Sequence, residues 1–427
     1  MYTDIFREIV EIMHNDYAGF IDKEGWDNPD EFMEKIQELE KSNTLTPNSF
    51  ADIVHDYILD FQDPHIIFNL IQSKTQHEMD NGFRTRRYED TLYVTSRTTE
   101  NRLNIGDALI SLDGIPISTL VEKHQRELME TKAEREDWRY IISKYHTAEV
   151  IDTSENKRIL EFKKYEKAPY QAEHYLKNVT DDTYYMKVTD FFSAEPIDQL
   201  VAQNKDILDH ISTLILDVRY NLGGSTDAYK SLEKYLFPEG NNTIDFSFYD
   251  MQYNYTERNV ALMVEAIDEE LKKIENKQQR EGLVEWKEQT WEKHRGKGLI
   301  RMDKGDKGNT YGVKGHTHPK RVIVLTDNYC GSAGDMFVYT CKQSPKVTVV
   351  GRPTMGINDY SNLTVKQWNN QFEFMYPTTR LTQIDTRKPD AEQGIKPDIY
   401  VPWTPKHIQK DVDMEVVRKV LAGEKVN

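Results

Sequence analysis

The sequence predicts an α/β protein that carries an N-terminal helical domain and a β-rich module ahead of its α/β core. Three observations predict this class: apolar residues at helical spacing over the first ~75 residues, alternating strand patterns from Tyr88, and short apolar runs between helix-compatible segments beyond about residue 165. At about 150 residues per domain, a chain of 427 residues fits roughly three domains. We expect these domains at residues 1–75, 76–165 and 166–427.

The N-terminal domain is predicted to be helical because apolar residues recur at near-helical spacing in two runs. Asn28-Pro29-Asp30, just before the second run, supplies the residue types that start a helix. The two runs are Ile5, Ile9, Ile12 and Met13, followed by Phe32, Ile36 and Leu39.

The β-rich module is predicted from apolar and polar residues that alternate along the chain. Residues 91–95 alternate as a strand does, and residues 105–117 are typical of a strand, a tight turn and a second strand. We therefore expect an all-β or mixed module of about 80 residues in this part of the chain.

The α/β core is predicted from continuous apolar runs, which are typical of strands buried on both faces. One long segment between these runs, residues 257–295, is rich in Glu, Lys and Gln and carries apolar residues at helical spacing, so we expect a helical insertion there. The apolar runs lie at residues 184–188, 213–218 and 321–325.

Composition and charge exclude several classes of protein. Hydrophobic residues make up 38% of the chain, enough for a sizeable core, and the net charge of −17 repels phosphate backbones and anionic lipids. We therefore expect no nucleic-acid and no membrane partner.

The N-terminal residues lack a signal-peptide pattern and no apolar run approaches about 20 residues, which predicts a cytoplasmic protein. Two cysteines, Cys330 and Cys341, fit no disulfide framework and no zinc pattern, and we expect no cofactor and no metal.

The strongest local pattern lies at residues 325–337, where a buried strand passes through the small residues Gly331-Ser332-Ala333-Gly334 into a helix. Such a corner exposes a serine hydroxyl and aims helix N-terminal amides at an adjacent anion. Ser332 is therefore a candidate nucleophile. The same small residues also fit a plain helix start, and the pattern alone leaves both interpretations open. Cys330 is interpreted as a small packed thiol and not as the nucleophile.

A second pattern joins the apolar strand at residues 214–218 to Gly223 and Gly224. Two glycines let the backbone approach a ligand closely and present its amides, which an oxyanion hole requires. A tight turn would use the same glycines, and Asp217 and Arg219 would then simply pair with each other. This pattern also leaves both interpretations open.

Taken together, these segments resemble the serine peptidase family of the C-terminal-processing proteases and the tricorn core protease, to which the repeats of interphotoreceptor retinoid-binding protein are related. The order and spacing of the motifs are similar to the family's over the last ~260 residues, and residues 106–114 resemble the strand-turn signature of its PDZ-like domain. The resemblance implies a ClpP/crotonase-like core behind a PDZ-like module. The stretches that carry it are Asp217-Val218-Arg219-Tyr220-Asn221-Leu222-Gly223-Gly224, Ser332-Ala333-Gly334-Asp335, Val350-Gly351-Arg352-Pro353-Thr354-Met355-Gly356 and Gly394-Ile395-Lys396-Pro397-Asp398-Ile399.

The resemblance implies roles for individual residues. Ser332 falls on the family's nucleophile, the amide of Ala333 on one oxyanion donor, and Gly223 or Gly224 on the second. The processing-protease branch uses a lysine base in a Thr-x-Gly-Lys segment, but Ile357 occupies that position here. The usual Ser/Lys mechanism is therefore excluded, and the tricorn-like branch, which uses a histidine from an N-terminal segment, is the better match.

His65, in a segment similar to the family's Asp-x-His, is the implied base, since imidazole titrates near neutrality. The implied carboxylate that orients it is Glu392, with Asp390 as the alternative. Pro64 replaces the serine that precedes the histidine in the tricorn-type tetrad. Asp335 replaces the glutamate that commonly follows the serine motif, an exchange that is conservative at a helix N-terminus.

Two functions stay in competition. The first is a serine endopeptidase that cleaves peptides or unfolded proteins through Ser332, His65 and Glu392. The second is an inactive family member that binds peptides or an apolar ligand, which the changes at Pro64 and Ile357 favour.

Overall fold

The computed structural model describes residues 1–71, 79–301, 309–387 and 393–425, and it groups the chain into two compact units, each described by itself below. The first unit combines Met1–Ser73, Asp245–Thr310 and Ile357–Ala391, and the second combines Lys74–Ile244, Tyr311–Gly356 and Glu392–Asn427. Each unit is therefore assembled from three separate stretches of the chain.

Helices cover most of the N-terminal part of the first unit, as the apolar spacing predicts. They are α1 (Tyr2–Glu11), the π-helical turn η1 (Ile12–Asp16), α2 (Pro29–Lys41) and α3 (Pro47–Ile58). Proline occupies the first turn of α2 and of α3, where its missing N–H costs nothing, and Thr46 and Ser49 form a capping box at the start of α3.

The sheet of the first unit joins stretches that are far apart in the sequence. Its central strand β20 (Phe372–Leu381) pairs antiparallel with β1 (Ile67–Leu70), β14 (Met251–Tyr255) and β19 (Tyr360–Trp368), and β15 (Gly298–Arg301) pairs with β14. Aromatic side chains of α3, β1 and β20 pack against the N-terminal helices in one core. The all-helical expectation for the first ~75 residues is wrong at β1, because pairing with β20 decides its conformation.

The predicted insertion at residues 257–295 is helical. It comprises α10 (Glu257–Leu271), α11 (Lys277–Trp286), the π-helical turn η6 (Lys287–Trp291) and the turn η7 (Glu292–His294). Tyr255, Val260 and Trp291 form a small apolar core beneath these helices. Across the described residues no helix combines the length and the apolar character that crossing a bilayer requires.

The β-rich module of the second unit is a sheet in the order β3-β4-β5-β7-β8, and its strands pair antiparallel. Trp138 and Leu109 lie in its apolar core. The strands are β3 (Phe83–Tyr88), β4 (Thr91–Arg97), β5 (Ala108–Leu112), β7 (Thr147–Ile151) and β8 (Lys157–Glu161), with β6 (Ile115–Pro116) beside β5, a separate pair β2 (Met79–Asp80) and β9 (Tyr165–Glu166), and the helices α4 (Ile117–Lys123), α5 (Gln125–Leu128) and α6 (Arg139–Ser143).

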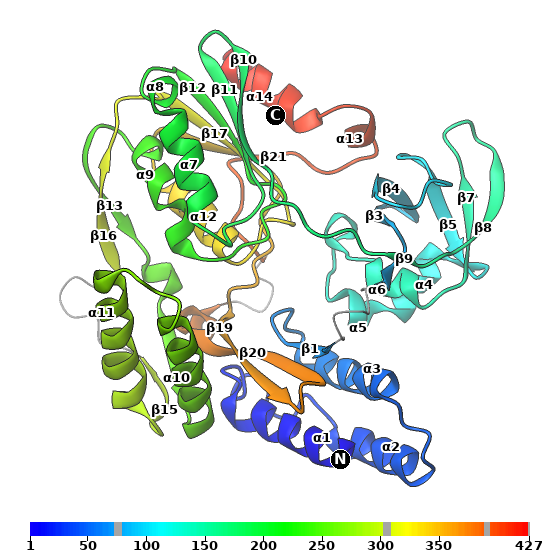
Figure 1. Ribbon diagram of the computed structural model, residues 1–427. Helices are drawn as coiled ribbons and strands as arrows, with labels where there is room; N and C mark the ends of the chain where they lie inside the picture. Colours follow the sequence, from blue (N-terminus) through cyan, green and yellow to red (C-terminus); the bar gives the residue numbers. More distant parts are fainter. Residues whose placement is uncertain (72–78, 302–308, 388–392, 426–427) are drawn as a thin grey trace. The chain divides into compact units, whose positions relative to one another are not determined.

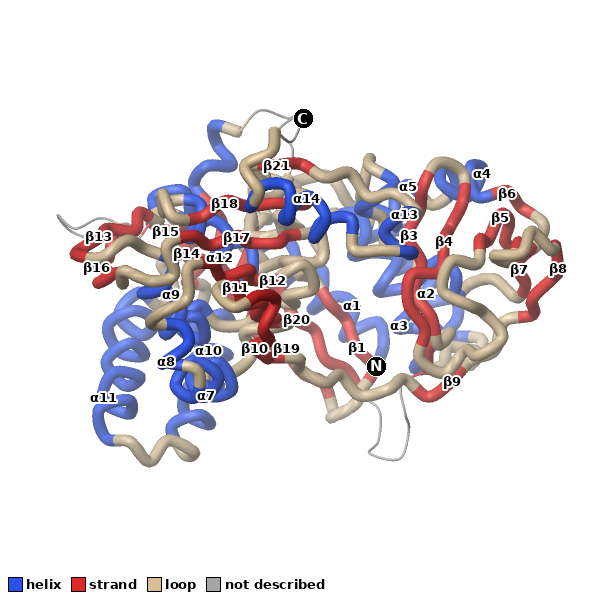
Figure 2. The backbone as a smooth tube through the Cα atoms, turned by 90° about the horizontal axis from the view of Figure 1, so that it is seen from above, coloured by secondary structure: helices blue, strands red, loops and turns tan. Residues whose placement is uncertain are grey.

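The core of the second unit is a six-stranded sheet in the order β10-β11-β12-β17-β18-β21, in which only β10 and β11 pair antiparallel. The three predicted apolar runs form its centre, and Figure 2 shows β17 and β18 side by side. The strands are β10 (His174–Thr180), β11 (Thr183–Val188), β12 (Thr213–Asp217), β17 (Arg321–Thr326), β18 (Val347–Gly351) and β21 (Ile399–Tyr400). A pair outside this sheet is β13 (Gly240–Asp245) with β16 (Thr310–Gly315).

Helices flank this core sheet. In Figure 1, α7, α9 and α12 lie together, and α14 lies apart from them. Val417 of α14 packs on Ile215, Ile323 and Val350 of the sheet. The helices are α7 (Glu195–Gln203), α8 (Lys205–Leu208), α9 (Lys230–Leu236), α12 (Ala333–Lys342), α13 (Lys406–Gln409) and α14 (Val412–Leu421). The mixed α/β class predicted from the sequence is confirmed.

The two compact units cut across the three linear domains that the sequence predicts. The N-terminal helices share a unit with the helical insertion and with β19 and β20, and the β-rich module shares one with the core sheet. A linear pattern cannot foresee this grouping, because it depends on pairing between distant strands. The domains at 1–75, 76–165 and 166–427 stay a prediction.

Candidate active site

Ser332 lies at the corner that the sequence predicts. Strand β17 ends at Thr326, helix α12 begins at Ala333, and Ser332 is the N-cap residue between them. Its φ of 57° and ψ of −118° place a residue with a side chain in a backbone region that is normally left to glycine. Strain of this kind is typical of a nucleophile that is lifted out of a strand-to-helix turn.

The turn that carries Ser332 is held by backbone hydrogen bonds on both sides. The amide of Gly334 donates to the carbonyl of Gly331 over 2.8 Å, and the amide of Met355 donates to the carbonyl of Cys330 over 2.7 Å. Cys330 is fully buried, and burial raises the pKa of its thiol well above the ordinary value. The thiol therefore stays protonated, which agrees with its interpretation as a packed side chain.

The backbone at Gly223 lies against Ser332. A Cβ atom at Gly223 would stand 2.8 Å from the Cβ of Ser332 and 3.3 Å from the amide nitrogen of Ala333, and the φ of Gly223 is +80°. Gly224, with a φ of +135°, instead approaches the backbone of Phe191, with which it forms a parallel bridge. The glycine pair therefore brings one backbone segment against the serine and joins it to the segment that follows β11.

Asn221, which the sequence motifs did not single out, joins the glycine loop to the serine turn. Its side-chain Oδ1 accepts the amide of Gly223 over 3.0 Å, and its Nδ2 donates to the carbonyl of Val188 over 3.1 Å. Its own carbonyl accepts the amide of Gly331 over 3.1 Å. An asparagine two residues before a glycine is a known turn signal, and this signal could have identified it.

Replacing Gly223 with alanine is expected to reduce any activity of Ser332 by about 10²-fold or more, because the new methyl group would displace the serine or the amide of Ala333. The measurement is the rate at which a fluorophosphonate labels Ser332. Gly114→Ala is the matched control, because Gly114 has a similar φ of +76° but nothing within 4 Å of a new Cβ. Equal labelling of the two variants would contradict the role given to Gly223.

His65 lies in the first unit, between Phe61 of the turn η2 (Leu59–Phe61) and strand β1. Its Nδ1 is 2.7 Å from the carbonyl oxygen of Tyr360, and its backbone amide donates to Oδ1 of Asp63 over 2.9 Å. A carbonyl oxygen can only accept, so Nδ1 carries the proton and the neutral ring presents an unprotonated Nε2. That is the tautomer which a general base needs.

The other predicted site residues divide into two groups. Glu392 and Asp390 lie outside the described residues, so the structure gives no position for either carboxylate. Asp335 is buried in the first turn of α12, and its Oδ1 accepts the amide of Gly356 over 2.8 Å. Asp335 therefore ties the serine helix to the turn that follows β18, a role in the fold that its position predicts.

The residues just before Ser332 are also held by charged side chains that the sequence analysis did not single out. Arg86 of β3 donates to both carboxylate oxygens of Asp327 over 2.9 and 2.7 Å, and Arg352 donates to the same carboxylate over 2.6 Å. Burial alone would raise the pKa of Asp327, but Arg352 and Arg86 outweigh it and hold the pKa well below its usual range. Asp327 is therefore ionised at neutral pH.

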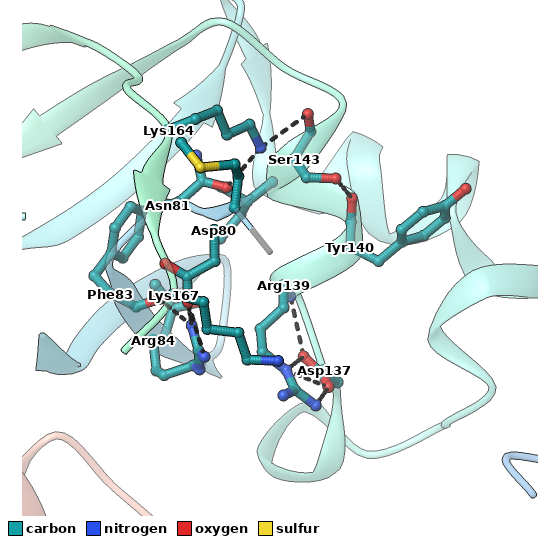
Figure 3. Close-up of a pocket in the computed structure, with 13 residues that line it drawn as sticks. Asp80, Asn81, Phe83, Arg84, Asp137, Arg139, Tyr140, Ser143, Lys164 and Lys167 are labelled. Carbon is teal, nitrogen blue, oxygen red and sulfur yellow. Dashed lines mark hydrogen bonds and ion pairs between the residues drawn. The ribbon is translucent and has the colours of Figure 1, made fainter. Parts of the chain in front are cut away.

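A pocket of about 320 Å³ lies in the β-rich module (Figure 3). Lys164 places its Nζ 3.1 Å from Oδ1 of Asn81, and Nδ2 of Asn81 is buried without a hydrogen-bond partner. Two ion pairs, Arg84 with Asp80 and Arg139 with Asp137, add to the polar lining. None of the predicted site residues that the structure describes lines this pocket. Within the described ranges, no group of three or more His, Cys, Asp or Glu residues is placed to hold a metal ion.

A strained serine at a strand-to-helix corner, with a glycine-bearing loop against it, is the arrangement of serine hydrolases. The model of peptidase family S41 matches residues 182–401, just over half of the chain. The chain therefore belongs to peptidase family S41, as the sequence motifs indicate, and its class is that of the serine peptidases. Among curated proteins the chain has no match.

Solved structures similar to this chain include mature CPAF, with 14% sequence identity, a TM-score of 0.64 and coverage of 98% of this chain and 96% of that one. Mature CPAF complexed with lactacystin gives 13% identity, a TM-score of 0.65 and coverage of 98% and 97%. The photosystem II D1 C-terminal processing protease gives 14% identity, a TM-score of 0.44 and coverage of 98% and 97%. At these identities the likeness to CPAF shows a shared fold along nearly the whole chain.

Proposed function

We propose that this protein is a serine endopeptidase that cleaves peptide bonds in peptides or unfolded proteins, with Ser332 as its nucleophile. The observation that carries the proposal is the left-handed backbone of Ser332 together with the Gly223 backbone packed against it. Membership in family S41 supports the same reaction class. The PDZ-like nature of the β-rich module, the ClpP/crotonase-like nature of the core and a cytoplasmic location stay predictions of the sequence.

In the proposed mechanism, Oγ of Ser332 attacks the carbonyl carbon of the scissile bond while Nε2 of His65 takes the serine proton. The imidazolium then gives that proton to the leaving amine, and water repeats the sequence on the acyl-enzyme. The mechanism requires Nε2 of His65 to reach Oγ of Ser332. It is supported by the tautomer of His65, whose Nδ1 faces the carbonyl of Tyr360.

Backbone amides would hold the oxyanion of the tetrahedral intermediate. Ala333 is the first donor, since its amide follows the serine directly at the start of α12. The amide of Gly223 is engaged by Oδ1 of Asn221 over 3.0 Å, so of the two predicted glycines Gly224 is the better second donor. Gly223 then serves by leaving room for the serine.

The main chain gives His65 a partner that the sequence did not predict. The sequence assigns the ring N–H to a carboxylate of Glu392 or Asp390, but the Nδ1 of His65 lies at the carbonyl of Tyr360. We therefore propose that Tyr360 fixes the tautomer, and that Glu392, or Asp390 in its place, stabilises the imidazolium through its charge.

The test is labelling of the native protein with a fluorophosphonate, followed by mass spectrometry of the modified peptide. We expect one adduct, on Ser332, because only an activated serine hydroxyl reacts quickly with this probe. Labelled samples are then assayed on unfolded protein substrates, whose cleavage should fall in proportion to labelling. Absence of an adduct where a control serine hydrolase labels fully would overturn the proposal.

The pocket of the β-rich module favours a second candidate, a protein that binds peptides without cleaving them. Lys164 donates to the side-chain oxygen of Asn81 and the carbonyl of Ser143 there. Desolvation lowers the pKa of its ammonium more than the nearby charge of Asp80 raises it. The carboxylate of a peptide would give the Lys164 ammonium a charged acceptor.

Fluorescence anisotropy with a labelled peptide, either with a free C-terminal carboxylate or amidated there, tests whether the pocket binds peptides. Lys164→Met should weaken binding of the free acid, and Lys163→Met, at a neighbouring exposed lysine, should not.

A further inference from the structure

Tyr17 stands between the two groups that hold His65. It directly follows the π-helical turn η1 and is fully buried in the core of the first unit. Its hydroxyl donates to Oδ2 of Asp63 over 2.9 Å, and its ring lies against the ring of Tyr360, with 5.3 Å between the centroids. One side chain therefore contacts both Asp63 and Tyr360.

Asp63 and Tyr360 hold His65 at its two ends. Oδ1 of Asp63 accepts the backbone amide of His65, which fixes the main chain, and the carbonyl of Tyr360 accepts Nδ1, which fixes the ring. Tyr360 is itself held, since its hydroxyl donates to Oδ2 of Asp22 over 2.9 Å. The position of the imidazole thus depends on a buried network within one unit.

The space for the Tyr17 ring is provided by Gly19. A Cβ atom at Gly19 would lie 2.4 Å from the hydroxyl oxygen of Tyr17 and 2.5 Å from its Cζ, so even alanine would push the ring away. Burial and the neighbouring Asp63 raise the pKa of Tyr17 well above its usual value. The hydroxyl therefore remains a donor throughout the pH range in which a histidine titrates.

We propose that Tyr17 is a positioning residue for His65, acting through the carboxylate of Asp63 and the ring of Tyr360. The catalytic role of Tyr17 rests on the proposed function, because His65 is the base of the proposed reaction. It gives the N-terminal helical segment a role in building the active site. Misplacing a catalytic group by about 1 Å costs about 10²-fold in rate, so such a residue has a large effect without touching the substrate.

The test compares two variants that disturb Tyr17 differently. Tyr17→Phe removes the hydroxyl, and Gly19→Ala keeps the hydroxyl but displaces the ring. Both are expected to lower kcat and the rate of fluorophosphonate labelling about 10- to 100-fold, with KM nearly unchanged. Tyr57→Phe is the matched control: Tyr57 is buried in the same core and donates to Oδ2 of Asp27 over 2.6 Å, so it loses an equivalent hydrogen bond.

Nitrogen-15 spectra of the histidine rings provide a readout that a general loss of stability would not change. In the native protein we expect His65, assigned by its absence in His65→Gln, to hold its proton on Nδ1. Tyr17→Phe and Gly19→Ala should give a mixture of tautomers, and Tyr57→Phe should give the native spectrum.

The outcomes separate this inference from the proposed function. If His65→Ala abolishes labelling while Tyr17→Phe and Gly19→Ala label as fast as Tyr57→Phe, Tyr17 does not position the base and the proposed function stands. A native ring spectrum in Tyr17→Phe would overturn the inference as well. If His65→Ala labels like the native protein, His65 is not the base: this inference and the proposed charge relay then fall, and Ser332 stays the proposed nucleophile.

Discussion

Alanine at Ser332 is expected to lower kcat for peptide cleavage by about 10⁴-fold or more and to leave KM within a few-fold of the native value. The substitution removes the Oγ that we propose as the nucleophile, whereas the amides of Ala333 and Gly224, which we propose as oxyanion donors, remain. Initial rates on an unfolded protein substrate measure the loss. Ser344→Ala is the control, since Ser344 is also buried in the second unit and donates its hydroxyl to the carbonyl of Leu236.

The same experiment tests whether Ser332 and His65 act together. Groups that act as one unit give non-additive losses, so the double variant Ser332→Ala/His65→Ala should be no slower than Ser332→Ala alone. His65→Ala alone should cost about 10³-fold or more, because the serine would lack its base. If the rate loss of the double variant equals the product of the two single losses, the two residues serve different steps. The charge relay would then be wrong.

The sequence predicts the strand-to-helix corner at Ser332 and the glycine loop well because both are local features. A buried strand, a turn of small residues and a helix occupy neighbouring positions, and a strand followed by two glycines is visible in the same way. The structure adds the backbone angles of Ser332 and the contact with Gly223. The backbone angles and the contact depend on the pairing of β12 with β17, and no short sequence motif predicts that pairing.

The contacts that hold His65 could not be predicted from the sequence. Nδ1 of His65 bonds to a main-chain carbonyl of Tyr360, and every residue of the chain carries such a carbonyl. Tyr17 and Asp63 are separated by 46 positions and have no spacing rule that joins them. The expectation of a carboxylate at Nδ1 therefore came from the family resemblance, and only the fold identifies the carbonyl.

The strand β1 illustrates the same limit in the fold. Its short apolar sequence fits a helix or a strand, and pairing with β20, about 300 positions later, decides between them. The helical insertion was predictable because its 3.6-residue period is sustained over α10 and α11. Periodicity thus reveals long local elements, whereas pairing across the chain decides how they are grouped.

Asparagine at Asp327 is expected to destabilise the second unit by about 3–5 kcal/mol. Asp327 is buried between Arg86 and Arg352, and both guanidinium groups are also buried, so the variant leaves buried positive charge without its counter-ion. Urea unfolding of the unit measures the loss. Glu415→Gln is the matched control, because Glu415 lies in the same unit, forms a solvent-accessible ion pair with Lys410 over 2.9 Å and should cost less than about 1 kcal/mol.

The pH dependence of this difference follows from the direction of the pKa shift. The pKa of Asp327 is depressed in the folded state, so its stabilisation is complete above the unfolded value of about 3.9 and is lost as the pH falls towards the folded pKa. The gap in unfolding free energy between the native protein and Asp327→Asn should therefore be constant near neutral pH and shrink below about pH 4. A gap that stays constant down to pH 3 would show that the carboxylate charge is not what holds the turn before Ser332. A loss no larger than that of Glu415→Gln would show that Arg86 and Arg352 are held by other groups. The link from the β-rich module to the serine turn would then lie elsewhere.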